Sequence, residues 1–148
     1  MLYNEYTYLK REKKMKFKHI LNEQVQPKTK KELRDIISRT IEREGMDCDL
    51  NFIDVSKITD MSGLFGYLKF SGDISKWDVS NVKDMSRMFS SAVFTADISM
   101  WDVSNVKDMS YMFRETDGLM RRDLSKWNVK NVENMRYMFY HSDFMGDI

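Results

Sequence analysis

The stretch DISKWDVSNVKDMSRMF, residues 73–89, decides the fold because the chain repeats it. Close copies begin at Asp97 (DISMWDVSNVKDMSYMF) and Asp123 (DLSKWNVKNVENMRYMF), and a more divergent copy begins at Asp49 (DLNFIDVSKITDMSGLF). Asp147 has the form of a fifth beginning. The opening aspartates are 24, 24, 26 and 24 residues apart. Periods of this length are typical of stacked supersecondary units, so the sequence predicts such a stack.

Two hydrophobic periods follow each other inside one copy. Polar and apolar residues alternate over 76–80, with Trp77 and Val79 apolar, which predicts a short strand. Val82, Met85 and the Met88-Phe89 pair then follow at three- and four-residue steps, which predicts a short helix. The predicted fold class is therefore α/β: a leucine-rich-repeat-like solenoid of short parallel strands plus short helices, with a return loop after each helix.

Stacked copies place equivalent side chains above one another. The sequence predicts three core ladders, made of Trp77, Trp101 and Trp127; of Phe65, Phe89, Phe113 and Phe139; and of Met61, Met85, Met109 and Met135. A methionine ladder at these spacings is core far more often than a metal or cofactor site, because the flexible thioether fills gaps.

A helix is predicted ahead of the first copy. Thr29 and Glu32 form a capping box, apolar residues recur at helical spacing from Leu33 to Ile41, and Gly45 ends the helix. The end of a repeat stack has to be covered, so we interpret this helix as the N-terminal cap. A partner-binding helix is the alternative. The predicted organisation is a basic, flexible N-terminal segment (1–27), the capping helix (28–48), and four repeats with the start of a fifth (49–148).

Charge and composition narrow the class of protein. Residues 1–48 carry a net charge of +4 and residues 49–148 one of −3, without the interleaving of aromatic and basic residues that suits base stacking. The pattern therefore argues against nucleic acid as a partner. Cys48 is the single cysteine, which excludes a disulfide or a cysteine-based zinc site within one chain. No apolar run is long enough to span a membrane, and no secretory apolar region is present, which favours a cytoplasmic or virion-associated protein over an exported one.

Nothing in the sequence has the form of a catalytic site. His19 and His141 are the two histidines, and neither belongs to a metal-ligand or Cys-His arrangement. Asp and Ser recur because the repeat recurs, and no glycine-rich phosphate loop is present. We therefore expect a non-enzymatic protein without a cofactor.

Two surfaces are candidates for binding a protein partner. The first is a predicted outward row that mixes apolar and basic side chains, namely Phe52, Lys76, Met100 and Lys126. The second is the loop 114–122, which carries the two extra residues of the 26-residue repeat and the basic residues Arg114, Arg121 and Arg122. Insertions in repeat proteins lie in loops on one face, often the binding face. A merely solvated sheet face is the alternative for the outward row.

A neighbouring outward row carries like charges. Asp54, Asp78 and Asp102 stack at about 4.8 Å, with Asn128 next, and such stacked carboxylates repel. Side-chain hydrogen bonds to nearby backbone N–H groups would compensate. The alternative is a bound cation such as calcium, for which carboxylate oxygens are suitable ligands.

The repeat resembles that of the BspA-like leucine-rich repeats, the bacterial surface protein 26-residue repeat. The likeness rests on the opening Asp-Ile-Ser, on Trp-Asp-Val-Ser-Asn-Val, and on Asp-Met-Ser-x-Met-Phe, and covers residues 49–148. It implies a curved right-handed solenoid and adhesion or protein binding at a bacterial surface, without catalysis. The sequence shows neither the export signal nor the C-terminal cap that this resemblance implies. We therefore expect either a fragment of a cell-surface adhesin or self-association through the last repeat.

A second resemblance concerns the start of the chain. Residues 15–23, MKFKHILNE, are similar to the capsid-targeting leader of tailed-phage head proteins. That likeness implies translation from Met15 and cleavage after the site formed by Leu21, Asn22 and Glu23. The alternative function is therefore a phage-encoded virion or host-interaction protein. The leading prediction is a protein-binding, adhesion-type repeat module whose partner the sequence does not identify.

Overall fold

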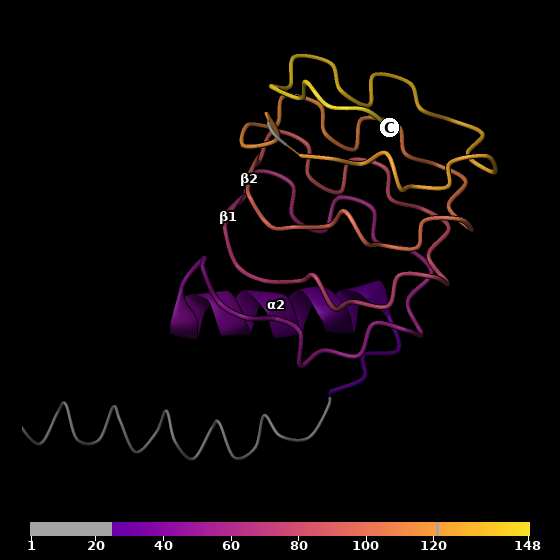
Figure 1. The fold of residues 1–148 in the computed structure, drawn as a ribbon. Helices are drawn as coiled ribbons and strands as arrows, with labels where there is room; N and C mark the ends of the chain where they lie inside the picture. The colour runs from indigo at the N-terminus through magenta and orange to yellow at the C-terminus, as the bar shows by residue number, and fades with distance from the viewer. Residues whose placement is uncertain (1–24, 121) are drawn as a thin grey trace, which may run out of the picture.

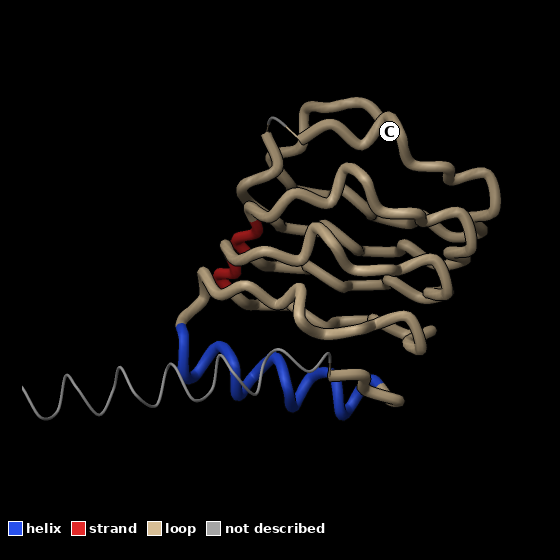
Figure 2. The backbone as a smooth tube through the Cα atoms, turned by 60° about the horizontal axis from the view of Figure 1, so that its bottom comes forward, coloured by secondary structure: helices blue, strands red, loops and turns tan. Residues whose placement is uncertain are grey.

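The computed structural model describes residues 25–120 and 122–148. The helix α2 (Lys30–Glu44) lies beneath a series of layers that follow the chain from its N-terminal to its C-terminal part (Figure 1). The strands β1 (Lys69–Phe70) and β2 (Val93–Phe94) pair in parallel at one side, with Lys69 opposite Val93. Figure 2 shows the layers as runs of loop and turn that lie nearly parallel to one another.

The helix predicted ahead of the first copy is confirmed, with its caps. Thr29 is the N-cap, and its Oγ1 accepts a hydrogen bond of 3.2 Å from the Glu32 N–H. The N–H of Gly45 closes the C-terminal end on the Ile41 carbonyl at 2.8 Å. The apolar stripe that contains Leu33 and Ile37 is buried. Burial of this stripe, at about 25 cal/mol per Å² of apolar surface, holds the helix against the first layer.

The predicted fold class is wrong. Among the described residues α2 is the only α-helix, and the two strands contain two residues each, so the structure is not an α/β, leucine-rich-repeat-like solenoid of strands and short helices. Neither the predicted strand at 76–80 nor the predicted helix over 82–89 forms. The strand pairing that does occur lies at 69–70 and 93–94, where the sequence predicted return loops.

Backbone conformation explains why the three- and four-residue spacing does not produce a helix. Arg87 and Ser91 both have φ of 55°, in the left-handed region that interrupts a right-handed helix. The same two positions are left-handed in the other copies, at Gly63 and Tyr67, Tyr111 and Glu115, and Tyr137 and His141. The apolar spacing places side chains inward through a series of turns, each closed by a bond such as Met88 N–H to Met85 C=O at 3.1 Å.

Side-chain hydrogen bonding explains why the alternation at 76–80 does not produce a strand. The Oδ1 of Asp78 accepts from the Ser80 N–H at 3.1 Å, which bends the chain into an Asx turn where a strand would stay extended. Trp77 and Val79 are nevertheless buried while Lys76 and Asp78 are exposed, so the alternation predicts burial correctly.

Backbone hydrogen bonds join each copy of the sequence to the next, and they run in both directions, as Lys107 N–H donates back to the Lys83 carbonyl at 2.8 Å. The N–H groups of Met85, Arg87 and Phe89 donate to carbonyl oxygens of the following copy, each at 2.9 Å. Equivalent bonds run from the copy at 61–67 to that at 84–90, and from the copy at 109–115 to that at 134–140. Along these segments every second residue donates its N–H to the following copy, and the bridges between copies are parallel. The copies therefore pair in parallel although most of this backbone is turn.

The aromatic ladders predicted from the sequence form the centre of the core. The rings of Phe89 and its neighbours Phe65 and Phe113 stack at centroid distances of 5.6 and 5.4 Å. The Trp77 and Trp101 rings lie 6.4 Å apart and within 6° of parallel. Met61, Met85 and Met109 are fully buried, whereas Met135 is 38% exposed because the last copy has no described neighbour beyond it.

Candidate partner-binding surface

The predicted outward row lies at the surface. Met100 is 71% exposed, Lys76 and Lys126 are exposed, and Phe52 is partly buried. The Lys126 Nζ lies 3.5 Å from the Met100 Sδ, so these two side chains are neighbours. The partner-binding role of this row stays a prediction.

The loop 114–122 is held by hydrogen bonds to neighbouring segments. The Asp143 carboxylate accepts from the N–H groups of Gly118 and Leu119, both at 2.8 Å. Arg114 forms a 2.6 Å ion pair with Glu115, and the Arg122 guanidinium donates to the Thr95 carbonyl. Two of the three predicted contact residues thus have intramolecular acceptors. The third, Arg121, lies outside the described residues.

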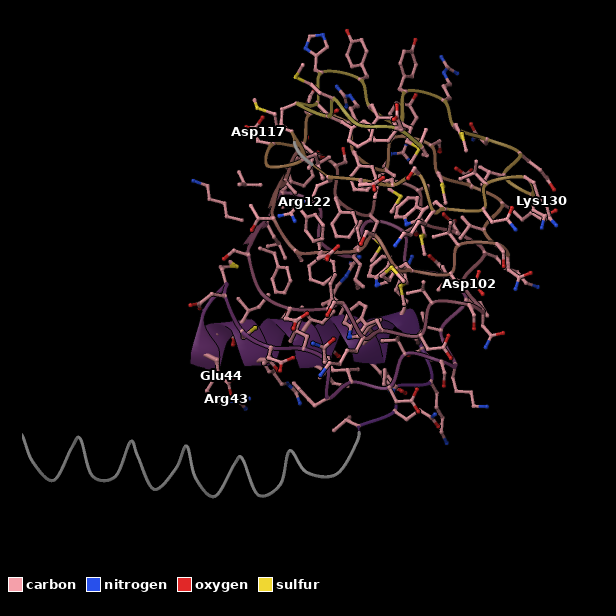
Figure 3. The ribbon with its side chains drawn as sticks, in the orientation of Figure 1. Arg43, Glu44, Asp102, Asp117, Arg122 and Lys130 are labelled. Carbon is pink, nitrogen blue, oxygen red and sulfur yellow. The ribbon has the colours of Figure 1, made fainter. Side chains whose placement is uncertain are left out.

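Figure 3 shows where labelled residues of the loop 114–122 and of the aspartate row lie. Asp117 and Arg122 of the loop lie toward one side of the molecule in this view, and Asp102 and Lys130 lie toward the other.

The aspartate row has the side-chain hydrogen bonds that the sequence predicted. Asp54, Asp78 and Asp102 accept from the N–H of the serine two residues on, at 3.0, 3.1 and 3.0 Å. The hydrogen bonds of Ser56 and Ser104 lower the pKa of the Asp54 and Asp102 carboxyls. Within the part of the chain that the structure describes, no group of three or more His, Cys, Asp or Glu side chains could hold a metal ion.

The remaining sequence predictions concern the two ends of the chain. The cleavage site at Leu21, Asn22 and Glu23 and the alternative start at Met15 lie outside the described residues. Self-association through the last copy stays a prediction.

Cys48 is buried, which raises the pKa of its thiol to about 11. The thiol is therefore protonated at neutral pH and a poor nucleophile.

The structure assembles a further surface that the sequence predictions missed. We call it the tyrosine–arginine face, and it consists of Arg87, Tyr111, Arg136, Tyr137, Tyr140 and His141. The Arg87 guanidinium lies over the Tyr111 ring at 4.8 Å, and the Tyr111 and Tyr137 rings are 5.4 Å apart. Arg136 lies over Tyr137 at 5.0 Å. The face continues through Tyr140, whose ring is 5.3 Å from Tyr137 and 4.1 Å from His141. In Figure 3, aromatic rings project outward from the C-terminal layers.

Large side chains of this face are exposed on a constrained backbone. Tyr137 and Tyr140 are 46% and 47% exposed, and Arg87 and Arg136 are exposed as well. Arg87, Tyr111 and Tyr137 have φ of 55°, 58° and 54°, a conformation that costs roughly 1–2 kcal/mol for a residue with a Cβ. Non-glycine residues in such conformations cluster at functional sites.

A signal for this face was present in the sequence. The variable position of Asp-Met-Ser-x-Met-Phe holds Gly63, Arg87 and Tyr111, and Tyr137 stands at the same place in the last copy. The repeat is otherwise nearly constant from 73 to 89 and from 97 to 113. These two copies differ at two positions, Lys76/Met100 in the outward row and Arg87/Tyr111 in the face, and such variation marks side chains that the common core does not require.

Comparison with known proteins places most of the chain in one family. Residues 34–148 match the model of the family described as Mycoplasma protein of unknown function, DUF285. No curated protein and no solved structure matches the chain. In the described residues, no helix is long and apolar enough to cross a membrane.

Proposed function

We propose that this chain, which belongs to the DUF285 family of Mycoplasma proteins of unknown function, is a non-enzymatic protein-binding module. The tyrosine–arginine face would be its binding surface. The observation that supports the proposal is the continuous contact of rings and guanidinium groups from exposed Arg87 through half-buried Tyr111 to exposed Tyr137 and Tyr140. Tyrosine and arginine are enriched among the residues that contribute most to protein–protein binding.

Rigidity also supports a binding role for this face. The backbone beneath it is fixed by hydrogen bonds between copies, such as Arg87 N–H to Ser110 C=O and Tyr111 N–H to Arg136 C=O, both at 2.9 Å. A surface whose side chains already contact one another loses less conformational entropy when a partner binds.

The likeness to BspA-like surface-protein repeats supports the same proposal. The repeated Trp-Asp-Val-Ser-Asn-Val and Asp-Met-Ser-x-Met-Phe segments carry that likeness, and it implies adhesion or protein binding. We propose that this chain and those repeats have related functions. The proposal does not include the strand-and-helix fold that the likeness implied.

Affinity capture with matched variants tests the proposal. The full chain, tagged, is used to capture proteins from an extract of the source cells, alongside three doubly substituted variants with unchanged thermal unfolding. These variants are Tyr137→Ala with Tyr140→Ala on the face, Met100→Ala with Lys126→Ala on the outward row, and Arg34→Ala with Arg39→Ala on α2. We expect a partner that is lost with the face variant and kept with the other two.

Direct binding of the purified partner then completes the test. Loss of two tyrosine anchors is expected to weaken binding by about 2–4 kcal/mol, the range of interface hot spots. A partner kept by the face variant but lost with Met100→Ala and Lys126→Ala would move the interface to the outward row and refute the face as the binding surface.

A further inference from the structure

Two guanidinium groups of the tyrosine–arginine face have no carboxylate partner within the described part of the chain. The ion pairs there involve Lys30, Arg43, Lys107 and Arg114, and neither Arg87 nor Arg136 belongs to them. Arg87 and Arg136 instead lie over tyrosine rings, at 4.8 and 5.0 Å. Arg136 also makes a side-chain hydrogen bond with Tyr137. A guanidinium carries five N–H donors, so each cation is held at the surface with donors left for an acceptor from outside.

Acidic groups near the face are already engaged. Glu115 is paired with Arg114 at 2.6 Å, and Glu133 is paired with Lys107 at 2.8 Å. Asp108 accepts hydrogen bonds from the Ser110 N–H at 2.7 Å and from the Asn134 side chain at 3.0 Å. The charge of Arg87 also contributes to lowering the pKa of the Asp108 carboxyl, but no described carboxylate forms an ion pair with Arg87 or Arg136.

Taken with the proposed function, on which this step rests, these contacts indicate the chemistry of the partner. We infer that the tyrosine–arginine face binds an acidic segment of a protein partner, whose carboxylates pair with Arg87 and Arg136 while its apolar groups lie on Tyr111, Tyr137 and Tyr140. A planar guanidinium matches a carboxylate in a two-point hydrogen bond. The face presents donors and aromatic surface to such a segment.

The remaining surface favours a short acidic segment over a nucleic acid. The copies at 49–148 carry a net charge of −3, so a long polyanion would meet repulsion outside the two arginines. Nucleic-acid binding relies on many phosphate contacts along a basic track. A protein segment with a few carboxylates needs only the local cations.

Fluorescence anisotropy with three labelled probes tests the inference. The probes are a twelve-residue peptide of alternating Glu and Ala, its Gln-Ala counterpart, and a twelve-nucleotide oligo(U) RNA. The protein is the full chain, together with Arg87→Glu/Arg136→Glu and the charge-matched control Arg34→Glu/Arg39→Glu on α2. We expect the acidic peptide to bind the parent at least about tenfold more tightly than the Gln-Ala peptide and the RNA. The face variant should lose at least about tenfold, and the control less than about twofold.

Other results overturn the inference in distinguishable ways. Equal losses in the face variant and in the α2 control would mean that net charge alone drives binding. Tighter binding of the RNA, lost in the face variant, would replace the acidic segment with a nucleic acid. If a captured protein depends on Tyr137 and Tyr140 while the acidic peptide does not bind, the proposed function stands and the acidic class fails. If the peptide binds but no captured protein depends on the face, the function fails instead.

Discussion

The indole Nε1–H of Trp101 donates a hydrogen bond to the carbonyl oxygen of Ile74, 3.2 Å away and one copy earlier in the chain. Trp77 and Trp127 make the same bond to the carbonyls of Leu50 and Ile98, at 2.9 and 3.1 Å. The tryptophan of the repeat therefore fills the core and also ties each copy to the one before it. The sequence predicted the first role and not the second.

Replacement of Trp101 separates these two roles. Trp101→Phe keeps a buried ring but removes one of the two donors to the Ile74 carbonyl, which still accepts from the Trp77 N–H at 3.2 Å, so we expect a loss of about 0.5–1.5 kcal/mol in unfolding free energy. Trp101→Ala also leaves a cavity and should cost about 3–5 kcal/mol. Urea denaturation measures both, with Met100→Ala, at a 71% exposed side chain, as the control expected within about 0.5 kcal/mol of the parent. A loss well under 1 kcal/mol for Trp101→Ala would show that the tryptophan is not core.

The left-handed position at Arg87 is tested by comparing two truncations. Arg87→Ala and Arg87→Gly remove the same contact with Tyr111, but only Gly adopts φ of 55° without a steric penalty. We expect Arg87→Gly to be more stable than Arg87→Ala by about 1 kcal/mol in urea denaturation. At Lys83, which has no positive φ, the same pair of substitutions should not show this advantage. An Ala variant as stable as the Gly variant at 87 would contradict the left-handed assignment.

Acid lowers the stability through the Asx turns. The Ser99 N–H, 3.0 Å from Asp97 Oδ1, is the main cause that lowers the pKa of the Asp97 carboxyl below 3.8. A carboxyl with a lowered folded-state pKa contributes stability that is present above pH 3.8 and is lost as the pH falls through the folded-state value. Asp97→Asn should keep the turn, as Asn134 does with the Arg136 N–H at 3.1 Å, and should reduce the loss of stability in acid.

The matched variant for this prediction is Asp97→Ala. It removes the acceptor of the Ser99 N–H and should cost about 1 kcal/mol at neutral pH, where Asp97→Asn costs less. Thermal unfolding followed from pH 7 down to pH 3 provides the measurement. Parallel pH profiles for the parent and Asp97→Asn would show that this carboxylate does not contribute to the acid sensitivity.

The N-cap of α2 contributes to the stability of the whole chain. Thr29→Ala removes the acceptor of the Glu32 N–H, and we expect a loss of about 1 kcal/mol, the usual cost of an N-cap truncation. Because the α2 residues Leu33 and Ile37 are part of the common core, the loss should appear in the single unfolding transition of the chain. Ser38→Ala, at an exposed position inside α2, is the control. A separate early transition in Thr29→Ala would mean that α2 unfolds independently.

How far the sequence predicts this structure depends on the type of signal. The identities of core residues follow from spacing, because Phe89, Met85 and Trp101 are buried whichever backbone carries them. The caps of α2 follow from local chemistry at Thr29 and Gly45, which needs no tertiary context. The backbone between the copies could not be predicted, since apolar steps of three and four residues fit a helix as well as a series of turns with Arg87 and Ser91 left-handed.

The candidate site shows the same division. The outward position of Met100 and Lys126 was predictable from alternation. The tyrosine–arginine face was not predicted, although the predicted stacking of copies already placed Arg87, Tyr111 and Tyr137 at equivalent positions. The predicted helix at 82–89 would have placed these side chains at different angles.

The alternating hydrogen bonds of the turns make the first and last copies unlike at matching positions. Within the described residues, the carbonyls of Asp60, Ser62, Leu64 and Gly66 receive no backbone N–H, and the N–H groups of Met135, Tyr137, Phe139 and His141 find no backbone acceptor. Elsewhere in the same copies the bonds run the other way, as from Lys107 N–H to Lys83 C=O at 2.8 Å. A backbone segment that paired with residues 135–141 would therefore have to supply carbonyl oxygens at every second residue.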